Sequence, residues 1–570
     1  MRKKEYNSTR RRQFVLICFA VCAVVLVVRA VDLQILQQDF LRTEGDARHL
    51  RVVSLPAHRG MIMDRNGEPV AMSTPVDSVW ANPRETIHVE RQRLAALARL
   101  LGIGEEDLYQ RIAQRAEREF VYLRRHINPD VAQQVRALGI PGVALQREYR
   151  RYYPMGETSA HILGFTNIDD RGQEGVELAY EDWLAGRPGA KRVLRDRLGR
   201  TIRDVENIRP AQPGRDLMLT IDQRLQYVAY RELKAAVQAR NALAGTAVIL
   251  DARNGDVLAM VNQPSYNPNN RSSLRGDASR NRAVTDLFEP GSTIKPFTVA
   301  AALDSGAISP DIRIETSPGQ IRVGRHTIRD VRNYGNVDLT TMMVKSSNVA
   351  MVKISNQMEP SALWTIYHRA GFGRLTGSGF PGEATGVLRD FILWRQAERA
   401  TLSFGYGLSV TALQLAQSYL AIAGDGLVYT PRLIQSNDPR YAEQVMQPAT
   451  ARALRLMLEG ATRDGTGTRA RVEGYRVAGK TGTVRKSAAG GYAQDRYLAL
   501  FAGFAPVSDP RLVMIIMIDE PRTGEYYGGQ VAAPVFSRVM HDALRLLNIV
   551  PDDLPGLEAA QSRTRPRGGA

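Results

Sequence analysis

The sequence predicts an α+β protein in which a single transmembrane helix precedes two folded parts. An apolar run follows a basic N-terminus, and strand-like segments occupy both ends of the second half of the chain. Mostly helical segments separate these two sets of strands. Because turn signals join the strands as hairpins, we expect an antiparallel sheet flanked by helices and not a doubly wound parallel sheet.

The composition is that of an ordinary folded protein. The 570 residues are 44% hydrophobic and 24% charged, which predicts two to four compact units. Much of the formal charge of +17 lies in residues 1–12 and 561–570. The rest forms no long basic run, so nucleic-acid binding is not supported. Cys18 and Cys22 are the only cysteines, which suits a chain that faces an oxidising space.

The N-terminus predicts an uncleaved signal-anchor. Residues 1–12 form a basic tail that should stay cytoplasmic, while the following chain is exported. The apolar run Phe14–Val28 is short for a membrane span, but Ala30–Leu36 can extend the helix, so we expect a transmembrane segment at 13–36. A cleaved signal peptide is the alternative, with a poor cleavage site near Arg29.

Residues 37–220 predict an elongated, irregular α/β pedestal. We expect an amphipathic helix to about residue 50, a hairpin at Asn66-Gly67 and helices over 88–138. Residues 165–220 are rich in Gly, Arg and Asp and are typical of an irregular platform.

Residues 221–550 predict a second compact domain, followed by a flexible tail at 551–570. Apolar segments on both sides of Asn254-Gly255 indicate an antiparallel hairpin. Three further strand-like runs come near the far end: Arg476–Thr483, Tyr497–Pro506 and Leu512–Asp519. Helices are expected between the two sets, at Phe297–Leu303 and Thr411–Ala423.

The candidate chemistry starts at Ser292 and Lys295. Residues three apart on a helix share a face, so these two side chains should meet. A serine hydroxyl needs a base to become a nucleophile, and a partly desolvated lysine can supply one. Ser-x-x-Lys alone is common by chance, and taken alone it favours a capping serine with a solvated lysine.

Two further motifs strengthen this prediction. Ser-x-Asn follows Lys345, and Lys-Thr-Gly-Thr lies in a predicted strand, where a glycine lets a substrate backbone approach closely. The three motifs in this order are typical of penicillin-recognising serine enzymes. Their residues are Ser346 and Asn348 in the second motif and Lys480, Thr481, Gly482 and Thr483 in the third.

On these motifs the chain resembles the class B penicillin-binding proteins, and among them the FtsI-type division transpeptidases. The catalytic half contributes GTAVILDARNGDVLAM (245–260), FEPGSTIKPF (288–297), IRDVRNYG (328–335), KSSNVAMVKI (345–354), FGYGLSVTALQLA (404–416) and VAGKTGT (477–483). The front half contributes RGMIMDRNG (59–67), YPMGETSAHILG (153–164), GQEGVE (172–177) and DRLGR (196–200). The resemblance implies a dimerisation-type pedestal and a transpeptidase domain with a serine β-lactamase-like fold.

The resemblance also implies residue roles. Ser292 is expected to be the acylated nucleophile and Lys295 its base. Ser346 is expected to relay a proton and Asn348 to hold the peptide amide of the substrate, while Lys480 tunes the network. Which lysine or serine moves each proton remains open at this stage.

The strand motif is expected to bind the substrate. Thr481 and Thr483 would bind its terminal carboxylate beside Gly482, and the backbone N–H groups of Ser292 and Thr483 would form the oxyanion hole. Tyr526 and Tyr527 form a possible cleft wall; the alternative is a simple turn.

Other polar residues favour structural roles. Arg59, Asp64 and Glu177 are expected to form a buried ion-pair core, and His161 is expected to be a satisfied structural histidine. Residues 474–481 fit the P-loop expression, but no apolar strand precedes them and no helix can follow. We therefore expect no nucleotide, no cofactor and no metal.

The implied function is that of a peptidoglycan D,D-transpeptidase, which is a target of β-lactams. The donor stem would end in D-Ala-D-Ala, and the expected partners are a glycan polymerase, FtsW, and other divisome proteins. The alternatives are a transpeptidase of the elongation machinery, a D,D-carboxypeptidase, a β-lactamase or a β-lactam sensor. The expected location is the bacterial inner membrane at the division septum, with the catalytic domain periplasmic.

Overall fold

The structure is a computed structural model that describes residues 8–39, 50–195, 201–274, 276–488 and 491–553, and it divides into two compact units. Unit 1 contains the chain up to residue 58, together with 75–150 and 186–214. Unit 2 contains 59–74, 151–185 and the chain from residue 215 onward. The chain therefore passes back and forth between the two units, and from residue 215 onward it stays in unit 2.

The N-terminal apolar run forms one long helix. Helix α1 covers Ser8–Val31 and continues as a π-helical turn over Asp32–Leu36. The helix is long and apolar enough to cross a membrane, and the extension predicted for Ala30–Leu36 is confirmed. The basic tail and the amphipathic helix predicted to about residue 50 lie partly outside the described residues, at 1–7 and 40–49.

The remainder of unit 1 contains a three-stranded sheet and a small α/β part. The sheet is antiparallel, in the order β1 (Leu50–Leu55), β6 (Gly189–Arg195) and β7 (Thr201–Arg209). In the α/β part β3 (Pro69–Ala81) pairs with β4 (Val121–Ile127) and β5 (Val143–Tyr152), although the start of β3 and the end of β5 belong to unit 2. The helices are α3 (Pro83–Thr86), α4 (Arg91–Leu101), α5 (Glu105–Ala113) and α6 (Pro129–Ala137). Its core includes Leu94, Leu97, Leu108, Ile112 and Val135.

The sequence prediction for unit 1 was incomplete. The helices expected over 88–138 are present, but β4 lies among them, and the irregular platform expected over 165–220 contains β6 and β7. Strand β7 carries four charged residues in nine, and both Val205 and Ile208 are exposed. A strand with charged residues at so many positions lacks the two-residue hydrophobic period that reveals strands in a sequence.

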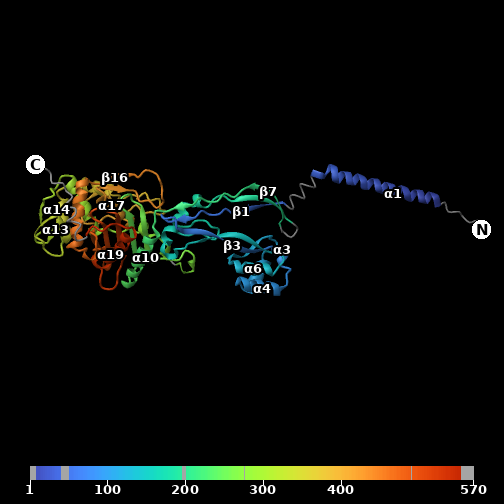
Figure 1. Cartoon of the computed structure of the whole chain (residues 1–570), viewed down its shortest axis with the longest axis horizontal. Helices are drawn as coiled ribbons and strands as arrows, with labels where there is room; N and C mark the ends of the chain where they lie inside the picture. The colour runs from blue at the N-terminus through green and yellow to red at the C-terminus, as the bar shows by residue number, and fades with distance from the viewer. Residues whose placement is uncertain (1–7, 40–49, 196–200, 275, 489–490, 554–570) are drawn as a thin grey trace, which may run out of the picture. The chain divides into compact units, whose positions relative to one another are not determined.

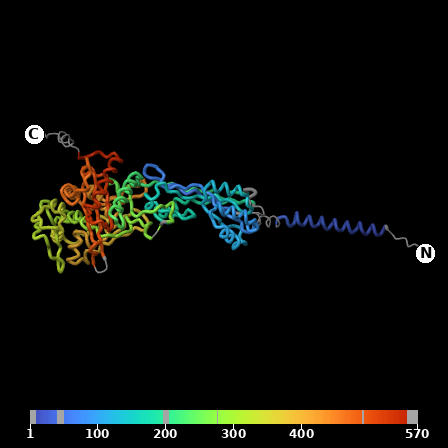
Figure 2. Tube along the Cα trace, turned by 90° about the horizontal axis from the view of Figure 1, so that it is seen from below, coloured from blue at the N-terminus to red at the C-terminus, as the bar shows by residue number. Residues whose placement is uncertain are grey.

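Unit 2 is built on a five-stranded antiparallel sheet in the order β10-β9-β19-β18-β17. The strands are β9 (Ala244–Asp251), β10 (Val257–Gln263), β17 (Ala478–Ala488), β18 (Gly491–Ala505) and β19 (Leu512–Asp519). In Figures 1 and 2 the green residues of β9 and the orange-red residues of β19 lie side by side, as their pairing requires. The predicted α+β fold, with a helical insertion between the first and last strands, is confirmed.

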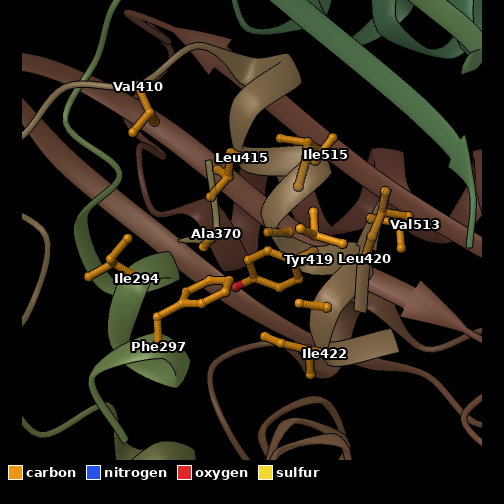
Figure 3. Close-up of a cluster of buried hydrophobic side chains, with 14 of the residues drawn as sticks. Ile294, Phe297, Ala370, Val410, Leu415, Tyr419, Leu420, Ile422, Val513 and Ile515 are labelled. Carbon is orange, nitrogen blue, oxygen red and sulfur yellow. The ribbon is translucent and has the colours of Figure 1, made fainter. Parts of the chain in front are cut away.

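Helices cover both faces of this sheet. One face carries α10 (Gln223–Ala239) and α19 (Gly528–Leu546), and the other carries α17 (Ala412–Ala423) and α18 (Pro448–Arg463), with α12 (Lys295–Asp304) packed on α18. Val513 and Ile515 of β19 lie near α17 (Figure 3), while Met514 and Ile516 belong to the cluster on the opposite face. An unbroken apolar strand is typical of a sheet buried on both faces.

Shorter elements complete unit 2. The helices are α7 (Ala160–Leu163), α8 (Gly175–Ala179), α9 (Glu181–Leu184), α11 (Arg282–Thr285), α13 (Leu339–Lys345), α14 (Asn348–Ser355), α15 (Pro360–Arg369) and α16 (Gln396–Leu402). The strand pairs are β2 (Ile62–Met63) with β8 (Leu217–Met218), β11 (Arg313–Glu315) with β14 (Asn336–Asp338), β12 (Gln320–Val323) with β13 (His326–Arg329), and β15 (Leu427–Tyr429) with β16 (Ala442–Gln444). The hairpin predicted at Asn66-Gly67 joins β2 to β3.

An aromatic contact ties the core to the start of α12. The rings of Phe297 and Tyr419 meet edge to face, with centroids 5.8 Å apart, and Figure 3 shows them facing each other. The hydroxyl of Tyr419 donates a hydrogen bond to the carbonyl oxygen of Thr293 at 2.8 Å. Thr293 directly follows Ser292, so the core of the sheet fixes the position of that serine.

Unit 2 also contains a buried ion-pair network. Arg59 contacts Glu177 at 2.6 Å and Glu181 at 2.7 Å, and Arg151 contacts Glu177 at 2.6 Å. The side chains of Arg59 and Glu177 are 1% and 0% exposed. The ion pair expected between these two residues is therefore confirmed, and Arg151 is an additional member.

Asp64 has a different role from the one predicted. Its carboxylate accepts hydrogen bonds from the backbone N–H groups of Asn66, Glu68 and Gln223, so it stabilises the turn after β2. His161 is buried beside the carbonyl oxygen of Ala278 at 2.9 Å, and burial lowers its pKa to about 4. A histidine that stays neutral at physiological pH agrees with the structural role expected for it.

Replacing Glu177 with glutamine would remove the carboxylate that the buried Arg151 contacts and would leave Arg59 paired with Glu181 alone. Breaking a buried ion pair from one side typically costs about 3–5 kcal/mol, so we expect a clear loss of unfolding free energy. Urea and thermal denaturation of the detergent-solubilised chain measure this loss. The control is Glu206→Gln, which breaks an exposed pair with Arg192 and should cost less than ~1 kcal/mol. Equal effects of the two variants would contradict a stabilising role for the network.

Candidate active site

Ser292 lies in a tight turn that leads into α12. Gly291 has a φ of +54°, in the left-handed region that favours glycine, and residues Gly291–Ile294 form one 3₁₀ turn. A Cβ atom on Gly291 would lie 2.6 Å from Cγ2 of Val484, so glycine also lets the turn pack against β17. Pro296 falls in the first turn of α12, where its missing N–H is not needed.

Lys295 is fully buried, and its amino group has three hydrogen-bond acceptors. Nζ donates to the carbonyl oxygen of Ser346 at 2.6 Å, to Oγ of Ser346 at 3.0 Å and to Oδ1 of Asn348 at 2.7 Å. Burial and the nearby charge of Lys480 hold the pKa of Lys295 well below its usual value, although the Asp330 carboxylate opposes this shift. A lysine in this environment can act as a neutral amine.

Ser346 connects Lys295 to Ser292. Its Oγ donates a hydrogen bond to Oγ of Ser292 at 3.2 Å. When Lys295 is neutral, the carbonyl and amide oxygens take its two N–H groups, because these oxygens can only accept, and its lone pair is left for the Ser346 hydroxyl. The sequence predicted that the Ser292 and Lys295 side chains meet, whereas the hydrogen bonds link them through Ser346.

Asp330 holds the turn that carries Ser346. Ser346 ends α13 with a φ of +58°, which is uncommon for a residue with a side chain. The Asp330 carboxylate accepts hydrogen bonds from Ser347 Oγ at 2.5 Å and from the backbone N–H groups of Asn348 and Val349 at 2.5 and 3.1 Å. Sequence reasoning gave Asp330 no role, because a single aspartate in a turn-rich segment has no spacing that marks it.

Strand β17 carries a second buried lysine. Lys480 is 1% exposed, burial lowers its pKa to about 7, and its Nζ donates to the carbonyl oxygen of Thr481 at 3.4 Å. The hydroxyl of Thr481 lies 2.6 Å from that of Thr466, a contact that the sequence did not predict. The hydroxyl of Thr483 accepts from the backbone N–H of Gly528 at 3.0 Å.

Gly482 allows β17 to pass close to the Ser292 turn. A Cβ atom at this position would lie 3.1 Å from Cγ2 of Thr293 and 3.2 Å from the carbonyl oxygen of Pro290. The sequence suggested that this glycine makes room for a substrate backbone. The structure shows that it also makes room for the protein itself.

Tyr526 and Tyr527 belong to an aromatic stack at the start of α19. Tyr526 stacks on Tyr497 with ring centroids 4.1 Å apart, and its centroid lies 4.5 Å from that of Tyr527. Tyr527 is 54% exposed and directly precedes Gly528, whose N–H bonds Thr483. The stack therefore lies beside the motif of β17, and its role as a cleft wall stays a prediction.

The structure thus brings the three sequence motifs together. Hydrogen bonds connect Ser292, Ser346, Lys295 and Asn348, and close packing places β17 against the Ser292 turn. Within the described part of the chain, no group of three or more His, Cys, Asp or Glu residues is arranged to hold a metal ion. A hydroxyl linked to a desolvated amine can attack an acyl group.

Comparisons with known proteins point to one family. Residues 245–541 match the penicillin-binding protein transpeptidase domain, and residues 54–219 match the penicillin-binding protein dimerisation domain. The chain is 43% identical to the peptidoglycan D,D-transpeptidase FtsI of Escherichia coli K12, over 97% of this chain and 95% of that protein.

Two solved structures extend the similarity. The transpeptidase domain of Burkholderia pseudomallei penicillin-binding protein 3 is 42% identical, with a TM-score of 0.55, over 59% of this chain and 98% of that domain. Mycobacterium tuberculosis penicillin-binding protein 3, in complex with aztreonam, is 28% identical, with a TM-score of 0.69, over 88% of this chain and 98% of that chain.

Replacing Lys480 with methionine removes a charge that lowers the pKa of Lys295. Without that charge the pKa of Lys295 rises, so a higher pH is needed to make it a neutral base. We therefore expect the acid limb of the pH–rate profile for acylation by a fluorescent penicillin to move to higher pH. Second-order labelling rates measured across pH test this shift. Lys234→Met removes a surface lysine paired with Glu157 and should leave the profile unchanged. A slower reaction with an unmoved acid limb would contradict the coupling.

Proposed function

The chain belongs to the class B penicillin-binding proteins of the FtsI type, which are peptidoglycan D,D-transpeptidases, and we propose that Ser292 is the residue through which it acts. The observation that carries this proposal is the hydrogen-bonded chain from Ser292 through Ser346 to the buried Lys295. It lies within the residues that match the transpeptidase domain.

In the first half-reaction Ser292 Oγ attacks the carbonyl carbon of the penultimate D-alanine of a donor stem. The hydroxyl proton passes through Ser346 to Lys295, and it returns by the same route to the nitrogen of the departing D-alanine. An ester then joins the stem to Ser292. Splitting one difficult exchange into two acyl transfers lowers the barrier of each.

In the second half-reaction the amine of a neighbouring stem attacks the ester carbon. Its proton passes to Lys295 through Ser346 and then to Ser292 Oγ, which leaves as a hydroxyl. The new amide cross-links the two stems. Oxyanions form in both halves, and the backbone N–H groups of Ser292 and Thr483 are the donors proposed to stabilise them.

The remaining site residues bind the donor. Thr481, Gly482 and Thr483 hold the terminal carboxylate beside Lys480, whose charge favours an anion. Asn348 holds the peptide amide of the donor: its Nδ2 donates to the carbonyl oxygen of Arg329 at 3.4 Å, a long bond that a substrate carbonyl can replace. The aromatic stack of Tyr526 and Tyr527 forms a wall of the cleft.

The proposed domain organisation follows the family. It comprises a cytoplasmic tail at 1–12, a transmembrane segment at 13–36, a pedestal at 37–220, a catalytic domain at 221–550 and a flexible tail at 551–570. Of these, residues 1–7, 40–49, 196–200, 275, 489–490 and 554–570 lie outside the described residues. The matches at 54–219 and 245–541 support the two large domains, although 59–74 and 151–185 pack within unit 2.

The covalent step is tested with a fluorescent penicillin. We expect the purified chain to form a stable adduct and Ser292→Ala to form none, because the adduct is an ester of Ser292. The control is Ser309→Ala, which removes an exposed serine of the same unit and should label like the parent. Equal labelling of Ser292→Ala would contradict the proposal, and an adduct that hydrolyses within seconds would favour a β-lactamase or carboxypeptidase.

The cellular role is proposed to be cross-linking at the division septum. The apolar α1 supports anchoring in the inner membrane with the catalytic domain periplasmic, and similarity to FtsI supports a polymerase partner, FtsW, within the divisome. Depletion of the protein should give filaments without septa. Rounded cells that still divide would indicate the elongation machinery instead.

A further inference from the structure

The β12–β13 hairpin presents a polar face that the proposed chemistry does not use. The two strands pair antiparallel, with Ile321 opposite Ile328. Both isoleucines pack against the core of unit 2, and Val323 is buried there. Because side chains alternate between the faces of a strand, the opposite face consists of Gln320, Arg322, Thr327 and Arg329, all of which are exposed.

This region carries a concentrated positive charge. Arg322, Arg325, Arg329 and Arg332 lie within eleven residues, together with a single acidic residue, Asp330. The Asp330 carboxylate is engaged by the turn at Ser347 and Asn348. Among the residues that the structure describes, none of the four arginines has a carboxylate oxygen within 4.0 Å.

The two arginines of the polar face are held by neutral partners. Arg322 Nε donates to the carbonyl oxygen of Gly324 at 3.2 Å, and Arg329 Nε donates to Oε1 of Gln320 at 3.2 Å. These bonds restrict both side chains without neutralising them. A restrained guanidinium group loses less entropy when it binds a carboxylate in its two-pronged geometry.

The hairpin is attached directly to the active site. The carbonyl oxygen of Arg329 accepts from Asn348 Nδ2, and the next residue, Asp330, accepts from the backbone N–H of Asn348. Asn348 in turn contacts Lys295. The hairpin therefore borders the part of the cleft where Asn348 is proposed to hold the donor.

The spacing of the two arginines suits an extended peptide. Arg329 is opposite Gln320 and Arg322 is opposite Thr327, so the arginines are diagonal neighbours on one face, with a separation of about 7–8 Å. Alternate residues of an extended chain are about 7 Å apart. Two guanidinium groups can thus contact carboxylates on alternate residues, or share one carboxylate.

We propose that the face formed by Gln320, Arg322, Thr327 and Arg329 binds free carboxylates of the donor stem peptide, upstream of the D-alanines that react at Ser292. The proposal rests on the proposed transpeptidase function and adds a specificity site to it. Acidic residues in the stem supply the complementary charge. A small β-lactam that lacks the stem would not reach this face.

The test compares two synthetic donors that differ only upstream of the reacting end. One thioester donor has a free carboxylate on its acidic residue, and the other has a carboxamide there. We expect the carboxylate donor to acylate the parent protein about tenfold faster than the carboxamide donor, which is the effect of one charge-assisted hydrogen bond. Because salt screens charges, the difference between the two rates should shrink at high salt. The variant Arg322→Gln/Arg329→Gln should react with both donors at the carboxamide rate.

Two controls separate this effect from damage to the serine. Acylation by a fluorescent penicillin should be unchanged in the double variant. Arg99→Gln/Arg136→Gln removes two exposed arginines from α4 and α6 of unit 1 and should keep the parent's preference. If penicillin labelling falls in the double variant, Arg322→Lys/Arg329→Lys, which keeps the charge, should retain an intermediate preference.

Three results would overturn the proposal. The first is equal acylation rates of the parent with both donors. The second is a preference for the carboxylate donor that survives in Arg322→Gln/Arg329→Gln. The third is inhibition of the parent by an anionic polysaccharide that is equal for both donors, which would assign the face to a polymer. A parent that no penicillin acylates would instead refute the proposed function, so the two failures are distinguishable.

Discussion

The candidate active site depends on burying the amino group of Lys295. Burying an ammonium group without hydrogen-bond partners costs roughly several kcal/mol of folding free energy. The fold must therefore either surround the group with hydrogen-bond acceptors or lower its pKa so that it becomes a neutral amine. This structure does both: two oxygens of Ser346 and one of Asn348 surround Nζ, while Lys480 opposes its protonation. The unusual φ of Ser346 follows from this requirement, because its carbonyl and hydroxyl groups both serve the same amine. Asp330 stabilises the turn that makes this arrangement possible.

The rest of unit 2 supplies the rigidity that such a site needs. The hydroxyl of Tyr419 donates a hydrogen bond to Thr293 and so holds the Ser292 turn against the core. Strand β17 packs closely on the same turn because Gly291 and Gly482 lack side chains. Strand β17 of the sheet also brings Lys480 close enough to Lys295 to lower its pKa. Reacting groups a few tenths of an ångström out of position lose much of their rate advantage, which explains why helices support this sheet on both faces.

The sequence predicted which motifs the fold brings together better than it predicted the strands of unit 1. Short motifs at fixed spacing identified Ser292 and Ser346, and the sheet was predictable because strands buried on both faces, such as Leu512–Asp519, carry unbroken apolar runs. Strands β6 and β7 escaped prediction because their charged residues interrupt any such apolar run. Asp330 escaped because its contacts lie 17 to 19 residues further along the chain, a distance that no local pattern encodes. The hydrogen bonds that link Ser292 to Lys295 through Ser346 are likewise tertiary contacts, which no local pattern encodes.

The strand order of unit 2 also has a kinetic consequence. Strand β9 lies between β10, its neighbour in sequence, and β19, which is among the last strands of the chain. During synthesis β9 and β10 emerge long before β19, so an apolar strand edge stays unpaired and prone to aggregation in the meantime. Pairing across so long a loop is slow. Because β17 brings Lys480 near Lys295 only when it joins this sheet, the candidate site is completed at the very end of folding, and a chain that ends before β17 lacks it.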